Sequence, residues 1–155
     1  MRRVFTVSAV SGIFLGLLIG MGSTSWAQGR ARGRFYNKTD VSRIIKRLED
    51  NTDSFKSYID SEIDKTRLDK TPAEDRIWDR VRALESATDR LRSRFDRTDT
   101  WRETRNEVLE VVQEGKRIEQ LFERYQIYRR VFARWAGVRR DINTLAGVYE
   151  IPPIR

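Results

Sequence analysis

Apolar residues recur every three or four positions from Val41 to Tyr149, and this spacing constrains the fold more than any other feature of the chain. Sustained steps of three and four place side chains on one face of an α-helix, as in a coiled-coil seam. Between residues 39 and 149 the chain has one proline and three glycines, so little interrupts a helix. The spacing therefore predicts four amphipathic helices, over residues 41–63, 77–95, 101–125 and 128–149.

The breaks between these segments are marked unequally. Thr71, Pro72 and Glu74 form a helix-start signal with an N-cap residue, a proline in the first turn and an acid that completes a capping box. Thr100 and Glu103 repeat the N-cap and the acid. The third break, near residues 124–129, has no capping signal and is predicted as a kink or a tight turn.

Four long helices with short connections predict an all-α fold, an antiparallel up-down four-helix bundle after an N-terminal signal peptide. We divide the chain into a signal peptide (1–27), a flexible arm rich in Arg and Gly (28–39), the bundle (40–149) and a C-terminal tail (150–155). The alternative is a pair of long helical hairpins that completes its core by dimerising, so monomer and homodimer both remain open.

The first residues have the pattern of an export signal. Arg2 and Arg3 precede an uncharged stretch, and Ser25 and Ala27 supply the small residues of a signal peptidase site. We expect cleavage after Ala27 and an exported protein, periplasmic or extracellular. The alternative is an uncleaved anchor, since the uncharged stretch is long enough to span a bilayer.

A repeat relates the first two predicted helices. The sequence LEDNTDSFKSYID, at residues 48–60, returns as LESATDRLRSRFD at residues 84–96. Its apolar positions fall on the seam, which favours a duplicated structural unit. The other interpretation is that the charged stripe beside the seam holds a hard cation through carboxylate oxygens.

Several polar residues fall at or beside the seam and predict a buried polar layer. Two threonines can each donate to the carbonyl four residues earlier, on Leu48 and Leu84. We expect an arginine of the last helix to meet an acid of the second helix, either Glu85 or Asp89. The candidates are Thr52, Thr88, Glu85, Asp89, Arg139 and Asn143.

The composition excludes many catalytic and cofactor chemistries. The chain has no His and no Cys, and its two methionines, Met1 and Met21, lie in the predicted signal peptide. Haem, copper and di-iron sites of helical bundles use these ligands, and so do the common nucleophilic triads and zinc hydrolases. We therefore expect no cofactor and no enzyme activity.

Two functional classes remain. One is a structural or interaction module of the cell envelope with an unknown protein or envelope partner. The other is a basic protein that binds anionic lipid or cell-wall polymer, because the net charge is +8. Export argues against a nucleic-acid partner. The candidate anion-binding residues are Arg30, Arg32, Arg34, Lys38, Arg124, Arg129, Arg130 and Arg134.

Two segments resemble a group of exported, helix-rich bacterial proteins of unknown function. They are RLDKTPAEDRIWDRVRALESATDRLRSRFD, at residues 67–96, and WAGVRRDINTLAGVYEI, at residues 135–151. The resemblance implies export and a helical fold, and it implies no activity.

Overall fold

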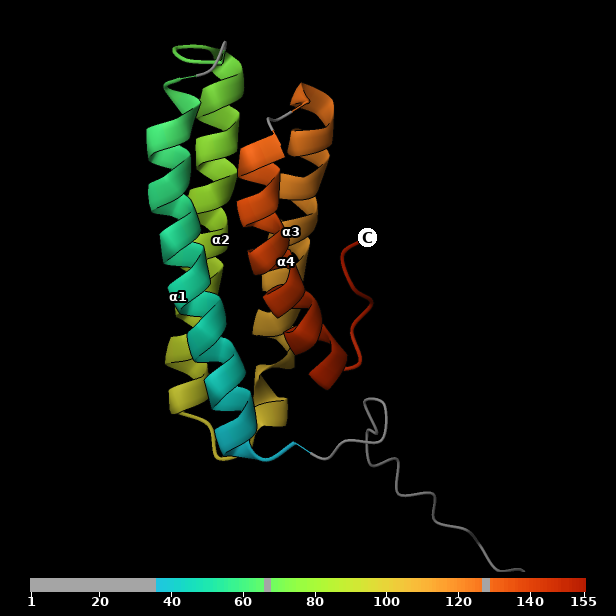
Figure 1. Cartoon of the computed structure of the whole chain (residues 1–155). Helices are drawn as coiled ribbons and strands as arrows, with labels where there is room; N and C mark the ends of the chain where they lie inside the picture. Colours follow the sequence, from blue (N-terminus) through green and yellow to red (C-terminus); the bar gives the residue numbers. More distant parts are fainter. Residues whose placement is uncertain (1–35, 66–67, 127–128) are drawn as a thin grey trace, which may run out of the picture.

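Four helices form the framework of the protein. The computed structural model describes residues 36–65, 68–126 and 129–155; the predicted signal peptide and nearly all of the predicted arm lie outside them. The helices are α1 (Lys38–Ile63), α2 (Pro72–Asp96), α3 (Arg105–Tyr125) and α4 (Arg129–Val148), with a short 3-10 helix, Trp101–Thr104, before α3. Each packs on its neighbours in the closed order α1, α2, α3, α4 (Figure 1). The predicted all-α fold is confirmed for these residues.

Helix α1 begins two residues earlier than the predicted bundle. Asn37 accepts a hydrogen bond from the backbone N–H of Asp40 at 2.8 Å, and the Asp40 carboxylate accepts from the backbone N–H of Asn37 at 3.3 Å. This reciprocal capping box starts the helix at Lys38. The boundary of the arm at residue 39 is therefore wrong, because Asn37 and Asp40 are a cap that we overlooked in the sequence.

The two predicted helix starts are confirmed, but one predicted hydrogen-bond partner is different. Thr71 caps α2, but the Glu74 carboxylate accepts from the backbone N–H of Lys70, at 2.6 Å, rather than from Thr71. At the second start Glu103 accepts from the backbone N–H of Thr100 at 3.1 Å, and this bond lowers the pKa of the Glu103 carboxyl. The turn after Thr100 is 3-10 before the chain becomes α-helical.

The third break is a turn. Helix α3 ends at Tyr125, and Gln126 takes a left-handed conformation with φ of 50°. Such a residue ends a helix because it turns the chain out of the helical path. Helix α4 then begins at Arg129.

The predicted seam residues line the core. The described seam residues of the segments that form α1, α2 and α4 are all buried: Val41, Ile45, Leu48, Thr52, Phe55, Ile59, Ile63, Ile77, Val81, Leu84, Thr88, Leu91, Phe95, Val131, Trp135, Val138, Ile142, Leu145 and Tyr149. The centre holds an aromatic cluster in which Phe55 and Phe122 lie 5.5 and 5.9 Å from Trp135, measured between ring centroids. Each such pair adds about 0.5–1.5 kcal/mol beyond the burial of its area. The aromatic cluster thus joins α1, α3 and α4 at the centre of the bundle.

The C-terminal residues belong to the core rather than to a separate tail. After α4 the chain turns back beside the bundle (Figure 1), and Ile151 and Ile154 are buried. Asn143 fixes this segment, since its amide donates to the Ile154 carbonyl at 3.0 Å and accepts from the Ile154 N–H at 2.7 Å. Gly115 makes room for it: a Cβ there would lie 2.5 Å from Ile154 Cδ1.

Candidate functional site

Positive charge is concentrated on helix α4. Helices α1, α2 and α3 carry five, six and four cations against six, six and five acids, so they are nearly neutral. Helix α4 carries five arginines and a single acid, Asp141. The excess charge of the four helices therefore belongs to one helix, and the composition alone did not reveal this distribution.

The single acid of α4 does not offset these arginines at the surface. Asp141 is buried, with 4% of its surface exposed, and its carboxylate lies 2.7 Å from the Arg47 guanidinium of α1. Asn51 of α1 donates to the second carboxylate oxygen. Asp141 thus serves the α1–α4 contact, and the outer side of α4 carries arginine without acid. We did not predict this residue as buried.

Four arginines that we predicted as anion-binding residues gather at the start of α4. Arg124 lies in the last turn of α3, and Arg129, Arg130 and Arg134 lie in the first two turns of α4; all four are exposed. We call them the α4 arginine cluster. None of them forms an ion pair with a carboxylate in the described part of the chain. The Arg134 guanidinium stacks on Tyr58 of α1, 5.3 Å from the ring centroid.

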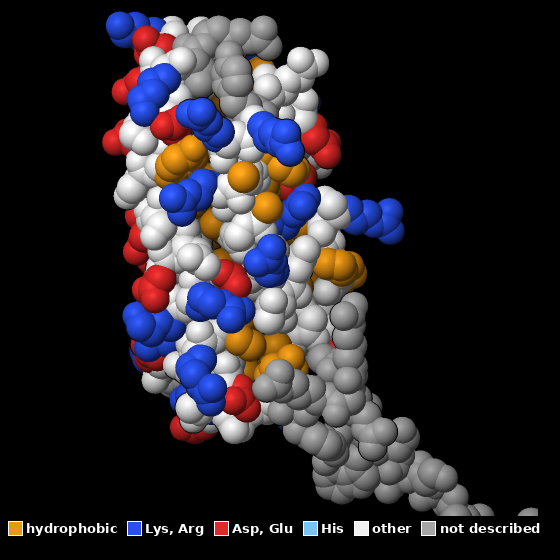
Figure 2. Space-filling view, in the orientation of Figure 1, with side chains coloured by type: hydrophobic (Ala, Val, Ile, Leu, Met, Phe, Trp, Pro, Cys, Tyr) orange, Lys and Arg blue, Asp and Glu red, His pale blue; other side chains and the backbone are white. Residues whose placement is uncertain are grey.

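The face formed by α1 and α4 shows this charge directly. In Figure 2 Lys and Arg side chains are spread across its centre, with small apolar patches between them, whereas Asp and Glu lie mainly along the left edge. One exposed apolar side chain, Phe132, belongs to α4, and the Arg139 guanidinium lies 5.5 Å from its ring centroid.

The remaining candidate cations divide into two groups. Arg30, Arg32 and Arg34 lie outside the described residues. Lys38 is the first residue of α1, and its ammonium donates to the backbone carbonyl of Thr98. It also lies 5.6 Å from the centroid of the Phe95 ring. Lys38 therefore joins the start of α1 to the end of α2 and lies in a helix rather than in the predicted flexible arm.

The structure does not bring the predicted polar residues together in one layer. Arg139 Nη1 lies 2.7 Å from Glu119 Oε1, and the expected pairing of Arg139 with Glu85 or Asp89 is wrong. The other Glu119 oxygen accepts from the indole N–H of Trp135. Glu119 lies on α3, beside α4, whereas α2 lies diagonally across the ring. We overlooked Glu119, although it follows the seam residue Ile118 and is buried.

The two threonines behave as expected. Thr52 and Thr88 are each 1% exposed, and their hydroxyls donate to the carbonyls of Leu48 and Leu84 at 2.8 and 3.0 Å. Each bond stays within its own helix. The matching positions of the repeat thus have matching structural contacts, which favours the structural interpretation. Asn143 holds the C-terminal segment and is not part of a layer with Arg139.

The charged stripe of the repeat already contains its own cations. Lys56 Nζ lies 2.6 Å from Glu85 Oε1, across the α1–α2 contact. Burial raises the pKa of the Asp89 carboxyl, and the neighbouring carboxylates of Glu85 and Asp53 raise it further. Beside these residues, Trp78 and Arg82 help to line a shallow depression of about 460 Å³. Its charges are mixed, so it favours no class of ligand.

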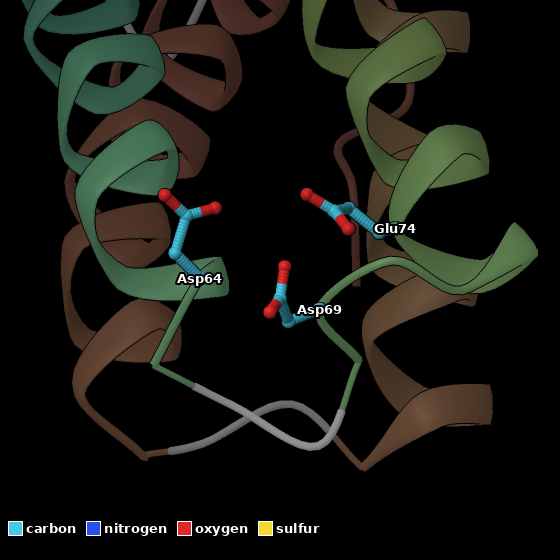
Figure 3. Close-up of side chains that lie close together, drawn as sticks. All are labelled: Asp64, Asp69 and Glu74. Carbon is cyan, nitrogen blue, oxygen red and sulfur yellow. The ribbon is translucent and has the colours of Figure 1, made fainter.

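One group of three carboxylates in the described residues has the spacing of a cation site. Asp64, Asp69 and Glu74 point toward one another at the α1–α2 connection (Figure 3), with oxygens within 4.8 Å. Hard cations prefer such ligands. Two contacts already engage the group, because Glu74 accepts from the Lys70 N–H and Lys70 Nζ lies 4.0 Å from Asp69. The group lies outside the charged stripe of the repeat, and we assign no function to it.

Comparisons with protein-family models, with curated proteins and with solved structures found no match to this chain. Within the described residues, no helix combines the length and the apolar character that crossing a bilayer would require.

Proposed function

We propose that this protein is an exported, non-catalytic interaction module of the cell envelope that binds an anionic partner through helix α4. The observation that carries the proposal is the charge distribution: the four arginines of the α4 arginine cluster form no ion pair within the described residues, while the only acid of α4 is buried. Of the two classes favoured by the sequence, the anion-binding one thus gains a specific surface.

The position of the cluster favours binding over stability. Arg129 and Arg130 lie in the first turn of α4, where the partial positive charge of the helix end repels cations. Neither side chain has an acid in the described residues to offset this repulsion. An anion at this surface would relieve the repulsion, and guanidinium groups bind phosphate and carboxylate through paired hydrogen bonds.

The absence of His and Cys from the sequence supports a non-catalytic role. The pattern Ser25-Trp26-Ala27, and the resemblance to exported helical proteins, support export. We expect the exported form to begin at Gln28. Intact mass and N-terminal sequencing of the periplasmic and extracellular fractions test this, and a full-length, membrane-bound product would contradict it.

Retention on immobilised polyphosphate tests the binding surface. Replacing the whole α4 arginine cluster with glutamine should weaken binding at least about a hundredfold, since each cation near an anionic surface contributes about 1 kcal/mol. The matched control replaces four exposed cations outside α4 that form no ion pair in the described part of the chain: Arg97, Arg102, Arg105 and Lys116.

The two variants have the same net charge, so net charge alone predicts equal losses. The proposal is supported if only the α4 variant loses binding and if added salt weakens binding by the wild type. Equal losses, or no salt-sensitive binding by the wild type, would overturn it. Circular dichroism of both variants confirms that they fold.

A further inference from the structure

The outer surface of α4 has little relief. Apart from Phe132, the exposed or half-exposed residues between the arginines of α4 are small, namely Ala133, Ala136 and Gly137, and Gly147 is exposed near the end of the helix. No heavy atom lies within 4 Å of the position that a Cβ would take at either glycine. The fold therefore does not require glycine there, in contrast to Gly115. A smooth, basic surface fits an extended anionic surface better than a small ligand, which would need a concave site.

Phe132 adds an apolar contact to this basic surface. It is the large hydrophobic residue that remains exposed in the described chain, with 37% of its surface accessible. It lies among cations, with the Arg139 guanidinium over its ring and Arg129 one helical turn earlier. A Phe side chain can enter the boundary between headgroups and acyl chains of a bilayer, and cations close to the surface are attracted to anionic headgroups.

A second copy of the chain does not fit this surface in a symmetric dimer. Such a dimer would place α4 of one copy against α4 of the other. Arg129, Arg130, Arg134 and Arg140, which form no ion pair in the described residues, would then face the same four arginines of the other copy. The only acid of each helix is buried against Arg47 and cannot offset them. Charge complementarity instead requires a partner rich in negative charge.

We infer that α4 docks on the headgroup layer of an anionic lipid bilayer, with the α4 arginine cluster and Arg140 contacting phosphates and Phe132 entering the headgroup boundary. The inference rests on the proposed function, and it names the partner class. It also explains why an apolar ring is exposed beside the arginines, which a soluble polyanion would not require.

Vesicle sedimentation tests this inference on the full mature chain. Vesicles of phosphatidylcholine and phosphatidylglycerol in equal parts should bind the protein, and vesicles of phosphatidylcholine alone should not. Replacing Arg129 and Arg130 with glutamine should weaken partitioning roughly thirtyfold, or about fivefold for each arginine. Phe132→Ala should weaken partitioning several-fold, and Phe132→Leu should restore most of it because an apolar side chain is enough.

Retention on polyphosphate distinguishes binding to a lipid bilayer from binding to any polyanion. Phe132→Ala should leave retention on polyphosphate unchanged, because only a bilayer offers an apolar layer. If polyphosphate binds through the α4 arginine cluster but anionic vesicles do not, the lipid inference fails and the proposed function stands. If Phe132→Ala leaves vesicle binding unchanged, the lipid inference also fails. If neither vesicles nor polyphosphate bind, both fail.

Discussion

Replacing Arg139 with methionine should destabilise the bundle through Glu119. Methionine keeps an unbranched apolar stem that can still pack beside Phe132, but it removes the donor that lies 2.7 Å from the Glu119 carboxylate. The Glu119 side chain is 8% exposed and would keep only the indole N–H of Trp135 as a partner. Removing one partner of a buried charge lowers the stability of the folded protein, because water cannot reach the charge to replace that partner.

The magnitude follows from the exposure of the two side chains. Breaking a fully buried pair costs about 3–5 kcal/mol, whereas a charged hydrogen bond contributes about 1.5–3 kcal/mol. The Arg139 side chain is 28% exposed, so water solvates part of this pair. We therefore expect a loss of about 2–3 kcal/mol in the free energy of unfolding, or a fall in Tm of about 8–12 °C for a domain of this size.

A double-mutant cycle measures the interaction itself. Arg139→Met and Glu119→Gln, alone and together, should show a coupling of about 1–2 kcal/mol in urea unfolding. The cycle between Arg139→Met and Glu85→Gln is the matched control, because Glu85 pairs with Lys56, and its effects should add. Arg130→Met, at an exposed site with no ion pair to the described residues, should change stability little. A coupling below about 0.5 kcal/mol between Arg139 and Glu119 would refute the reasoning.

Three further predictions concern other positions of the bundle. Thr88→Val should change the free energy of unfolding by less than about 0.5 kcal/mol, because the hydroxyl bonds only its own helix; a loss above 1 kcal/mol would reveal another partner. Gly137→Ala should raise Tm, because alanine is more favourable than glycine in a helix by about 1 kcal/mol. Gly115→Ala should lower Tm, because the added methyl group crowds Ile154. Equal shifts in Tm for the two variants would contradict both predictions. Burial raises the pKa of the Tyr149 phenol to about 12, so this phenol ionises at lower pH in the unfolded chain, and stability should be intact below pH 10 and fall between about pH 10 and 12. Tyr149→Phe should remove that part of the loss of stability at alkaline pH. An unchanged dependence of stability on pH in this variant would contradict the prediction.

Local pattern in the sequence predicted most of the framework. The seam residues were correct because a spacing of three and four residues fixes one helix face whatever packs against it. The bonds of Thr52 and Thr88 could be predicted for the same reason, since donor and acceptor lie on one helix. The apolar spacing also predicted a break near Gln126, where the sequence has no capping signal. The cap at Asn37 is a local signal too, and we overlooked it in the sequence.

Contacts between helices were decided by the tertiary structure alone. The partner of Arg139 depends on which helix lies beside α4, and a seam pattern leaves that choice open because it describes only the face toward the core. The ring order brings Glu119 of α3 next to Arg139 and keeps Glu85 with Lys56. It likewise buries Asp141 against Arg47, and this burial leaves the outer side of α4 purely basic. The sequence determined the helices and their core faces, because these follow from backbone periodicity. The basic surface of α4 depends on which residues beside the seams of neighbouring helices pair with one another, and that is decided by the packing of all four helices.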